Sequence, residues 1–163
     1  MLLEPLPYEE RLEPRPLSKI DLVVVHCTEV PTRALSREYG ERILYVGSQT
    51  GNSGHYYIDR DGTVVMYVRP ERVANHVRGY NDRSVGIELV NTGRYPYWRD
   101  SKHQAMTDPY PQAQIDALVA LLKQLQQELP NLHFIAGHED LDRDRETAFD
   151  DPNIMVARKL DPG

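Results

Sequence analysis

The sequence predicts an α/β fold in which a mixed central β-sheet carries flanking helices. Short apolar runs rich in β-branched residues recur along the chain, which is typical of buried strands. A long segment with apolar residues at helical spacing lies between the last two of these runs. Strands and helices in this order indicate a sheet with helices packed on it.

Composition limits the size of the protein and the partners it can bind. The chain has 163 residues, of which 40% are hydrophobic, and this suits one domain with a single core. Its formal net charge of −6 argues against a nucleic-acid partner, because binding to phosphates requires clustered Lys and Arg. No apolar run approaches the roughly 20 residues that span a bilayer, so no membrane association is predicted. The sequence does not indicate an oligomeric state.

The N-terminal segment, residues 1–19, contains four prolines among charged residues. We expect it to form an extended arm without regular hydrogen-bonded structure, and residues 20–163 to form the single domain. This acidic segment does not resemble a secretory signal, and a single cysteine, Cys27, allows no internal disulfide. The expected compartment is therefore the cytoplasm.

The first predicted strand, residues 20–26, is nearly continuous in apolar character and ends at His26. Such a run is typical of a strand that is buried on both faces. Thr32 then stands where its side chain can cap a short helix over residues 33–39, before Gly40. The chain is therefore expected to pass from the first strand into a helix.

A β-hairpin is predicted next. Residues 55–60 and 63–68 are rich in strand-forming side chains and flank the dipeptide Asp61-Gly62. This dipeptide is favoured in tight hairpin turns because its backbone accepts positive φ. The alternating run at residues 84–90 predicts another strand, and Glu88 is the charged residue inside it.

The last elements are a helix and a strand. An irregular loop at 92–110 precedes Pro111, which opens the helix, and Pro130 ends it. The predicted apolar face of this helix consists of Ile115, Leu118, Val119, Leu122, Leu125 and Leu129. Residues 133–138 then form a short strand that ends at His138. Two predicted strands therefore end in a histidine.

These two histidines suggest a metal site. Strand ends in such sheets are places where side chains from distant parts of the chain converge, so we expect His26 and His138 to meet. Asp161 is a third candidate ligand, and in the extended segment before Pro162 it points to the same side as Lys159. Two imidazoles and one carboxylate form a recognised catalytic zinc set. Asp161 could equally be an exposed tail residue, and three acids remain rival ligands: Asp140, Asp142 and Asp144.

Glu88 has two interpretations. Most glutamates in half-buried strands face solvent. Gly86 and Val90 share its face of the strand, however, so that face is not plainly solvated and a carboxylate there could act as a proton shuttle. A Cys-His nucleophile made by Cys27 and His26 is disfavoured, because adjacent strand residues face opposite sides.

Five segments together resemble a known family. They are the strand ending in Val25-His26, the run Ser53–Gly62, Asn81 with the strand Ser84–Leu89, the run Gly137–Asp140, and the run Arg158–Gly163. With these segments in this order over residues 20–163, the chain resembles the zinc-dependent N-acetylmuramoyl-L-alanine amidases of the AmpD and phage-lysozyme type. Their fold is shared with peptidoglycan recognition proteins.

The resemblance implies a role for each matched residue. It implies that His26, His138 and Asp161 hold one zinc ion per chain. It also implies that Glu88 is the acid/base residue and that Lys159 stabilises the oxyanion. His76 and Asn81 match positions near the substrate groove, whereas the role of the position matched by His55 is open. Family members usually continue past this Asp-Pro-Gly, so a ligand two residues from Gly163 is expected to be loosely held.

The reaction implied is hydrolysis of the amide between the lactyl group of N-acetylmuramic acid and L-alanine in peptidoglycan fragments. We expect a role in muropeptide recycling, because no export signal is visible in the sequence. The alternatives are a phage-type lytic amidase that acts on intact wall, a peptidoglycan-binding module without catalysis, and a generic α/β domain with unpaired histidines. The presence of Asp161 and Glu88 favours an enzyme over the binding module.

Overall fold

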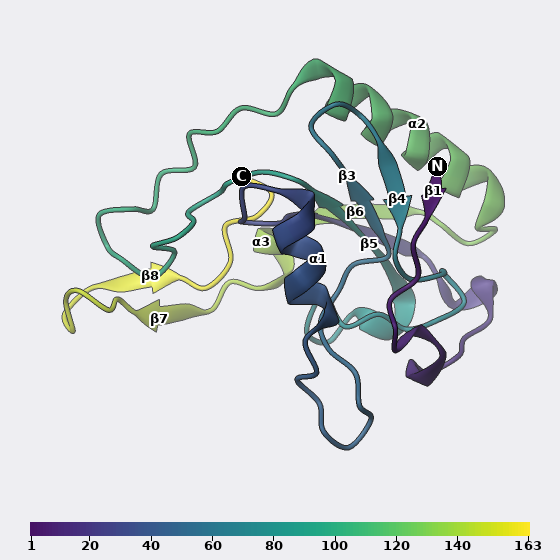
Figure 1. The fold of residues 1–163 in the computed structure, drawn as a ribbon, viewed down its shortest axis with the longest axis horizontal. Helices are drawn as coiled ribbons and strands as arrows, with labels where there is room; N and C mark the ends of the chain where they lie inside the picture. Colours follow the sequence, from purple (N-terminus) through teal and green to yellow (C-terminus); the bar gives the residue numbers. More distant parts are fainter.

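The core of the fold is a six-stranded sheet, seen in a computed structural model that describes residues 1–163 (Figure 1). Its strands lie in the order β1 (Leu2–Leu3), β4 (Val64–Met66), β3 (Tyr56–Ile58), β5 (Ser84–Leu89), β2 (Leu22–Cys27) and β6 (Phe134–Gly137). Neighbouring strands run parallel, except that β3 and β4 are antiparallel. The predicted mixed sheet is therefore confirmed.

Three α-helices accompany this sheet: α1 (Arg33–Glu41), α2 (Gln112–Glu128) and α3 (His138–Leu141). The side chain of Thr32 accepts a hydrogen bond from the Leu35 N–H at 3.2 Å, so the predicted cap of α1 is confirmed. The helix runs two residues further than predicted and includes Gly40. None of the helices has the length and apolar character needed to cross a membrane.

The predicted hairpin is formed by β3 and β4. Gly62 has φ of +86°, a conformation that L side chains rarely adopt, and its N–H donates to the Asp59 carbonyl at 3.0 Å. The Asp59 N–H donates to the Thr63 carbonyl at 2.9 Å, which closes the turn. The Asp-Gly signal in the sequence thus fixes both the turn and the register of the two strands.

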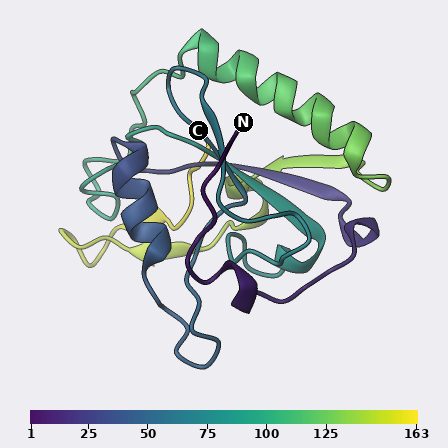
Figure 2. The ribbon, with the colours of Figure 1, turned by 45° about the vertical axis from the view of Figure 1, so that its right-hand side comes forward.

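Helix α2 covers one face of the sheet, and α1 lies apart from α2 (Figure 2). The side chains between α2 and the sheet form the largest buried cluster, whose members are Ile20, Val23, Val25, Tyr56, Ile58, Val85, Ile87, Leu89, Leu121, Leu125 and Leu129. Strand residues that alternate with these point to the opposite face. That second face is therefore the one on which the strand-end polar groups gather.

The buried face of α2 is rotated relative to the prediction. Val119 was expected on this face but is 44% exposed, whereas Leu121 was not expected there and is buried. The difference is explained by Gln114, which is fully buried. Its amide donates to the carbonyls of Ile58 and Val90 at 2.8 and 3.0 Å. These hydrogen bonds allow a polar side chain to be buried, whereas its polarity predicted an exposed position.

The N-terminal segment forms more structure than expected. Residues 1–19 contribute β1 and two turns of 3-10 helix, so the prediction of an arm without hydrogen-bonded structure is wrong. Each proline removes only its own N–H, so the other backbone groups of the segment can still pair. Leu6, Tyr8 and Leu12 are buried in a hydrophobic cluster that includes Tyr67. The Leu6 N–H, for example, donates to the Tyr67 carbonyl at 2.9 Å. The domain boundary after residue 19 stays a prediction.

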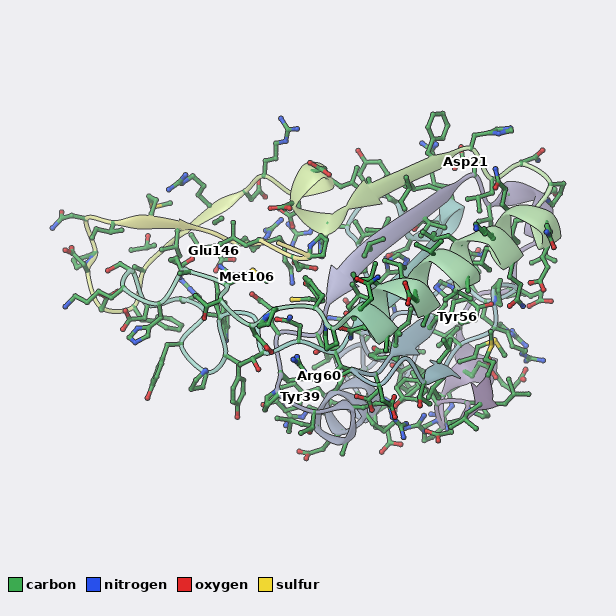
Figure 3. The ribbon with its side chains drawn as sticks, turned by 90° about the horizontal axis from the view of Figure 1, so that it is seen from above. Asp21, Tyr39, Tyr56, Arg60, Met106 and Glu146 are labelled. Atoms are coloured by element: carbon green, nitrogen blue, oxygen red, sulfur yellow. The ribbon has the colours of Figure 1, made fainter.

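A second, two-stranded sheet is formed by β7 (Arg145–Thr147) and β8 (Met155–Ala157). Figure 3 shows this hairpin, marked by Glu146, at the opposite end of the molecule from Asp21, with Met106 of the long loop near it. The Phe149 N–H donates to the Arg99 carbonyl at 2.9 Å, so the loop and the hairpin are joined. The chain leaves β8 toward the main sheet and ends there.

Candidate metal centre

Three ligand-type atoms meet beside the ends of β2 and β6. The Nδ1 atoms of His26 and His138 lie 2.9 Å apart, and each lies 3.1 Å from Oδ2 of Asp161. All three residues are at most 4% exposed. The structure therefore brings together the three residues that the sequence suggested as ligands, in a group that could hold a metal ion.

The chemistry of this triangle fits a metal ion. Two imidazole Nδ1 atoms that face each other at 2.9 Å cannot both carry a proton, so at least one lone pair points into the group, beside the carboxylate oxygen of Asp161. Four-coordinate zinc with bonds of about 2.0–2.1 Å separates its ligand atoms by roughly 3.3 Å, which is close to the observed spacing. In addition, the second oxygen of Asp161, Oδ1, is buried without a hydrogen-bond partner. A cation shared by these atoms would satisfy the buried carboxylate.

Sheet register places the two histidines. Strands β2 and β6 are parallel neighbours, and Val25 pairs with Gly137. The next residues along the two strands are His26 and His138, so both imidazoles emerge at the same edge. His138 is also the first residue of α3, which turns the chain away from the sheet. The convergence expected at the strand ends is therefore observed.

Asp161 is firmly held, contrary to the expectation from its position. The N–H of Glu139, beside His138, donates to the Asp161 carbonyl at 2.9 Å. The Tyr110 hydroxyl donates to the next carbonyl, that of Pro162. A Cβ at Gly137 would lie only 2.8 Å from the Pro162 ring, so this glycine allows the chain to approach closely. The backbone on both sides of the carboxylate is fixed.

The rival acids have other partners. Asp142 accepts hydrogen bonds from Nε and Nη2 of Arg158 at 2.9 and 2.8 Å. Asp144 lies 2.9 Å from the same guanidinium, and Asp140 accepts from the Gly137 N–H at 3.1 Å. These contacts remove the three acids from the metal group and leave Asp161 as its carboxylate.

The environment sets the protonation of the group. Burial lowers the pKa of His26, and the nearby Asp161 carboxylate only partly opposes this. Burial alone would raise the pKa of Asp161, but its contacts with His138 and His26 outweigh that effect and hold the pKa well below the usual range. A neutral imidazole and an ionised carboxylate are the forms that bind metals.

Glu88 and Lys159 share a cleft with the three candidate ligands. Its volume is about 650 Å³, and it extends toward α1 and the loop at 75–81. Burial and the charge of Asp161 raise the pKa of Glu88 well above its usual range. A carboxyl group with a raised pKa is suited to giving and taking a proton. Lys159 makes no hydrogen bond or ion pair within the protein, so its ammonium is available to a ligand.

The two residues expected near a substrate groove also line this cleft. Oδ1 of Asn81 accepts from the N–H groups of His76 and Val77 at 2.9 and 2.8 Å. His76 places Nδ1 2.9 Å from Nε2 of His26. Both side chains are engaged by the protein. Their direct contact with substrate stays a prediction.

His55 is a structural residue. Its Nδ1 accepts a hydrogen bond from the Gly86 N–H at 3.0 Å, so the ring proton is on Nε2, which donates to the Arg72 carbonyl at 3.0 Å. The guanidinium of Arg15 also lies 2.9 Å from Nε2, but two donors cannot bond each other. Burial lowers the pKa of His55 to about 3, so the ring is neutral. Cys27 is likewise buried, which raises the pKa of its thiol and makes it a poor nucleophile.

Arg94 is a residue that the sequence analysis missed. Its side chain is fully buried, and Nε donates to Glu29 at 2.7 Å. Its other nitrogens donate to the carbonyls of Ala157 and Arg158 at 2.8 and 3.2 Å, directly before Lys159. Arg94 thus joins the segment after β2 to the segment that carries Lys159 and Asp161. The only available signal was its place in a long loop.

Comparison with known proteins agrees with this geometry. Residues 16–163 match the family described as N-acetylmuramoyl-L-alanine amidase. An endolysin of Enterobacteria phage K11 is 35% identical over 85 residues, which are 52% of this chain and 52% of the endolysin. The chain thus spans about half the length of the curated relative it matches.

Two solved structures have the same fold. A selenomethionine derivative of AmpD has a TM-score of 0.62 and 24% identity, and the match covers 90% of this chain and 85% of that one. The amidase AmiD from E. coli, in complex with the substrate anhydro-N-acetylmuramic acid-L-Ala-D-γ-Glu-L-Lys, has a TM-score of 0.62 and 22% identity over 79% of this chain and 52% of that one. At these identities the likeness establishes the fold. Because the family match spans nearly the whole chain, the protein belongs to the N-acetylmuramoyl-L-alanine amidase family.

Proposed function

We propose that this protein is a zinc amidase that cleaves the amide between the lactyl group of N-acetylmuramic acid and L-alanine. The observation that carries the proposal is the buried group of His26, His138 and Asp161, which lies in the same cleft as Glu88. Two imidazoles and a carboxylate leave a fourth tetrahedral position open, as catalytic zinc sites do. Membership of the amidase family supports the bond that is cleaved.

The residues of the cleft divide the work of hydrolysis. When bound, zinc would supply Lewis-acid chemistry at the three ligands. Glu88 would take a proton from the attacking water and return it to the amine of L-alanine as the C–N bond breaks, because its raised pKa suits both transfers. The ammonium of Lys159 would stabilise the negative charge that develops on the carbonyl oxygen.

Muropeptides are the proposed substrates. AmiD, which has the same fold, was solved with a muramyl peptide as its substrate, and this supports the proposal for the present cleft. We propose action on soluble fragments in the cytoplasm during cell-wall recycling. The endolysin relative supports a second setting, in which the enzyme cleaves intact wall during lysis.

One experiment separates these possibilities. The purified protein would be analysed for bound zinc and then incubated with a soluble muramyl-L-alanyl peptide and, separately, with intact sacculi. We expect one zinc per chain and release of free peptide, detected by mass spectrometry, and His138→Ala should lose both. Protein that binds the peptide without cleaving it would instead be a binding module. Faster cleavage of the soluble peptide indicates recycling, whereas faster cleavage of the sacculi indicates lysis.

A further inference from the structure

We infer that His76 is a positioning residue that prepares His26 for metal binding. It does so by accepting the proton of His26 Nε2, which leaves Nδ1 free of a proton and directed at His138 and Asp161. This inference rests on the proposed metal site and adds a residue to it. The evidence is a chain of hydrogen bonds in which each proton can be placed.

The chain begins at a backbone carbonyl. Oγ of Ser84 lies 2.8 Å from the Tyr80 carbonyl oxygen, which can only accept, so the Ser84 hydroxyl donates its one proton there. Nε2 of His76 lies 3.1 Å from the same Oγ. Because the serine proton is already used, His76 must donate to Ser84, and its proton is therefore on Nε2.

The second half of the chain follows from the first. With its proton on Nε2, the neutral ring of His76 has a lone pair on Nδ1, which lies 2.9 Å from Nε2 of His26. His26 therefore donates from Nε2, and its lone pair is on Nδ1. A proton on Nδ1 of His76 would set two donors against each other across this contact. The tautomer of His26 is thus determined by a carbonyl three hydrogen bonds away.

This arrangement excludes one other role for His76. Both of its ring nitrogens are engaged, one with His26 and one with Ser84. His76 also contacts the edge of the His26 ring that points away from Asp161. It therefore cannot be a fourth ligand of an ion held at Nδ1 of His26.

The protein is shaped to hold this ring. A Cβ at Gly86, on β5, would lie 2.6 Å from Nδ1 of His76, so only glycine leaves room for the imidazole. The backbone N–H of His76 donates to Oδ1 of Asn81 at 2.9 Å, which fixes the start of the loop. By contrast, Nε2 of His138 makes no hydrogen bond in the structure. The two histidine ligands are therefore supported unequally, and only His26 has a dedicated partner.

Zinc affinity tests the inference. Partners that orient a metal ligand typically contribute about 10-fold to 100-fold in metal affinity. In His76→Leu, which fills the space without an acceptor, we expect a loss of this size in competition with a chromophoric chelator. His76→Asn keeps an acceptor near the position of Nδ1 and should retain most of the affinity. Ser84→Ala should lose less than His76→Leu, and the two losses should not add, because Ser84 acts through His76.

The tautomer provides a second readout that requires no metal. Long-range 1H–15N correlation spectra of the metal-free protein should show His26 and His76 protonated at Nε2. If His76→Leu fails to fold, as judged by circular dichroism, the inference is tested by this spectrum and by the zinc affinity of Ser84→Ala. A wild type that binds no zinc overturns the proposed function and this inference with it. Equal zinc affinity of wild type and His76→Leu, or a proton on Nδ1 of His26, overturns the inference alone.

Discussion

Glu88 pairs directly with His26 across the parallel strands β5 and β2, so their side chains emerge side by side on the same face of the sheet. The pairing places a carboxyl group of raised pKa next to a candidate metal ligand without any loop between them. Gly54 packs against this carboxylate from the neighbouring segment, because a Cβ there would lie 2.8 Å from Cγ of Glu88. Two rigid strands therefore set the geometry between Glu88 and the candidate ligand His26.

The first prediction concerns Glu88. In Glu88→Gln, amide hydrolysis should fall by at least about 10²-fold, because the general acid/base is lost, while zinc remains bound. Steady-state kinetics and zinc analysis of the same sample would measure the two properties. Glu128→Gln, on the exposed side of α2, serves as the control and should behave as wild type. Unaltered turnover in Glu88→Gln would remove this residue from the mechanism.

Lys159 is expected to act on turnover more than on binding. Lys159→Met should lower kcat by about 10²-fold to 10³-fold with a smaller change in KM, since the charge it meets develops only in the transition state. Lys123→Met removes an exposed lysine of α2 and is the matched control. If KM rises while kcat is unchanged, Lys159 binds the substrate and does not stabilise the oxyanion.

Arg94 is expected to stabilise the fold around the site. Arg94→Met removes a fully buried guanidinium and leaves the half-buried Glu29 without its partner, so the free energy of unfolding should fall by about 2–4 kcal/mol in urea denaturation. The double variant with Glu29→Gln should recover part of this loss. The exposed pair of Arg42 and Glu38 provides the control, because Arg42→Met should cost less than about 1 kcal/mol. Equal losses for the buried and exposed pairs would contradict the proposed role of Arg94.

His55 should make stability depend on pH. Its pKa is about 3 in the folded protein and about 6.5 in the unfolded chain, so the unfolded chain binds the extra proton between these values. Stability from this group is present above pH 6.5 and is lost as the pH falls toward 3. Between about pH 7.5 and about pH 5 the loss should be about 2 kcal/mol. His55→Gln should show a pH dependence that is weaker by this amount in denaturant titrations at both pH values.

The local elements were predictable because their signals are local. The apolar runs, the Asp-Gly turn and the Thr32 cap each act within a few residues, and each was found where the sequence placed it. The convergence of His26 and His138 was also predictable, because parallel strands bring their ends to one edge. The roles of Glu88 and Lys159 stay predictions that the experiments above address.

Other features depend on distant contacts and could not be predicted from the sequence. The sequence did not distinguish Asp161 from its acidic neighbours as a candidate metal ligand. In the structure, Arg158 engages two of those neighbours, and the Glu139 N–H fixes the backbone of Asp161. The rotation of α2 follows from two strand carbonyls that Gln114 reaches across the core. The contact between His76 and His26 joins residues 50 positions apart through a loop, and loops carry no periodic signal.

The three candidate ligands lie far apart along the chain, because 112 residues separate His26 from His138 and 135 separate it from Asp161. An ion bound to all three would therefore close loops that include most of the protein, in the manner of a cross-link. For a disulfide, closing a loop of such length restricts the unfolded chain by about 5 kcal/mol in the chain-entropy description. Unlike a disulfide, this link can be added or withdrawn by mass action. The availability of free zinc would then determine how long the enzyme survives as well as whether it is active.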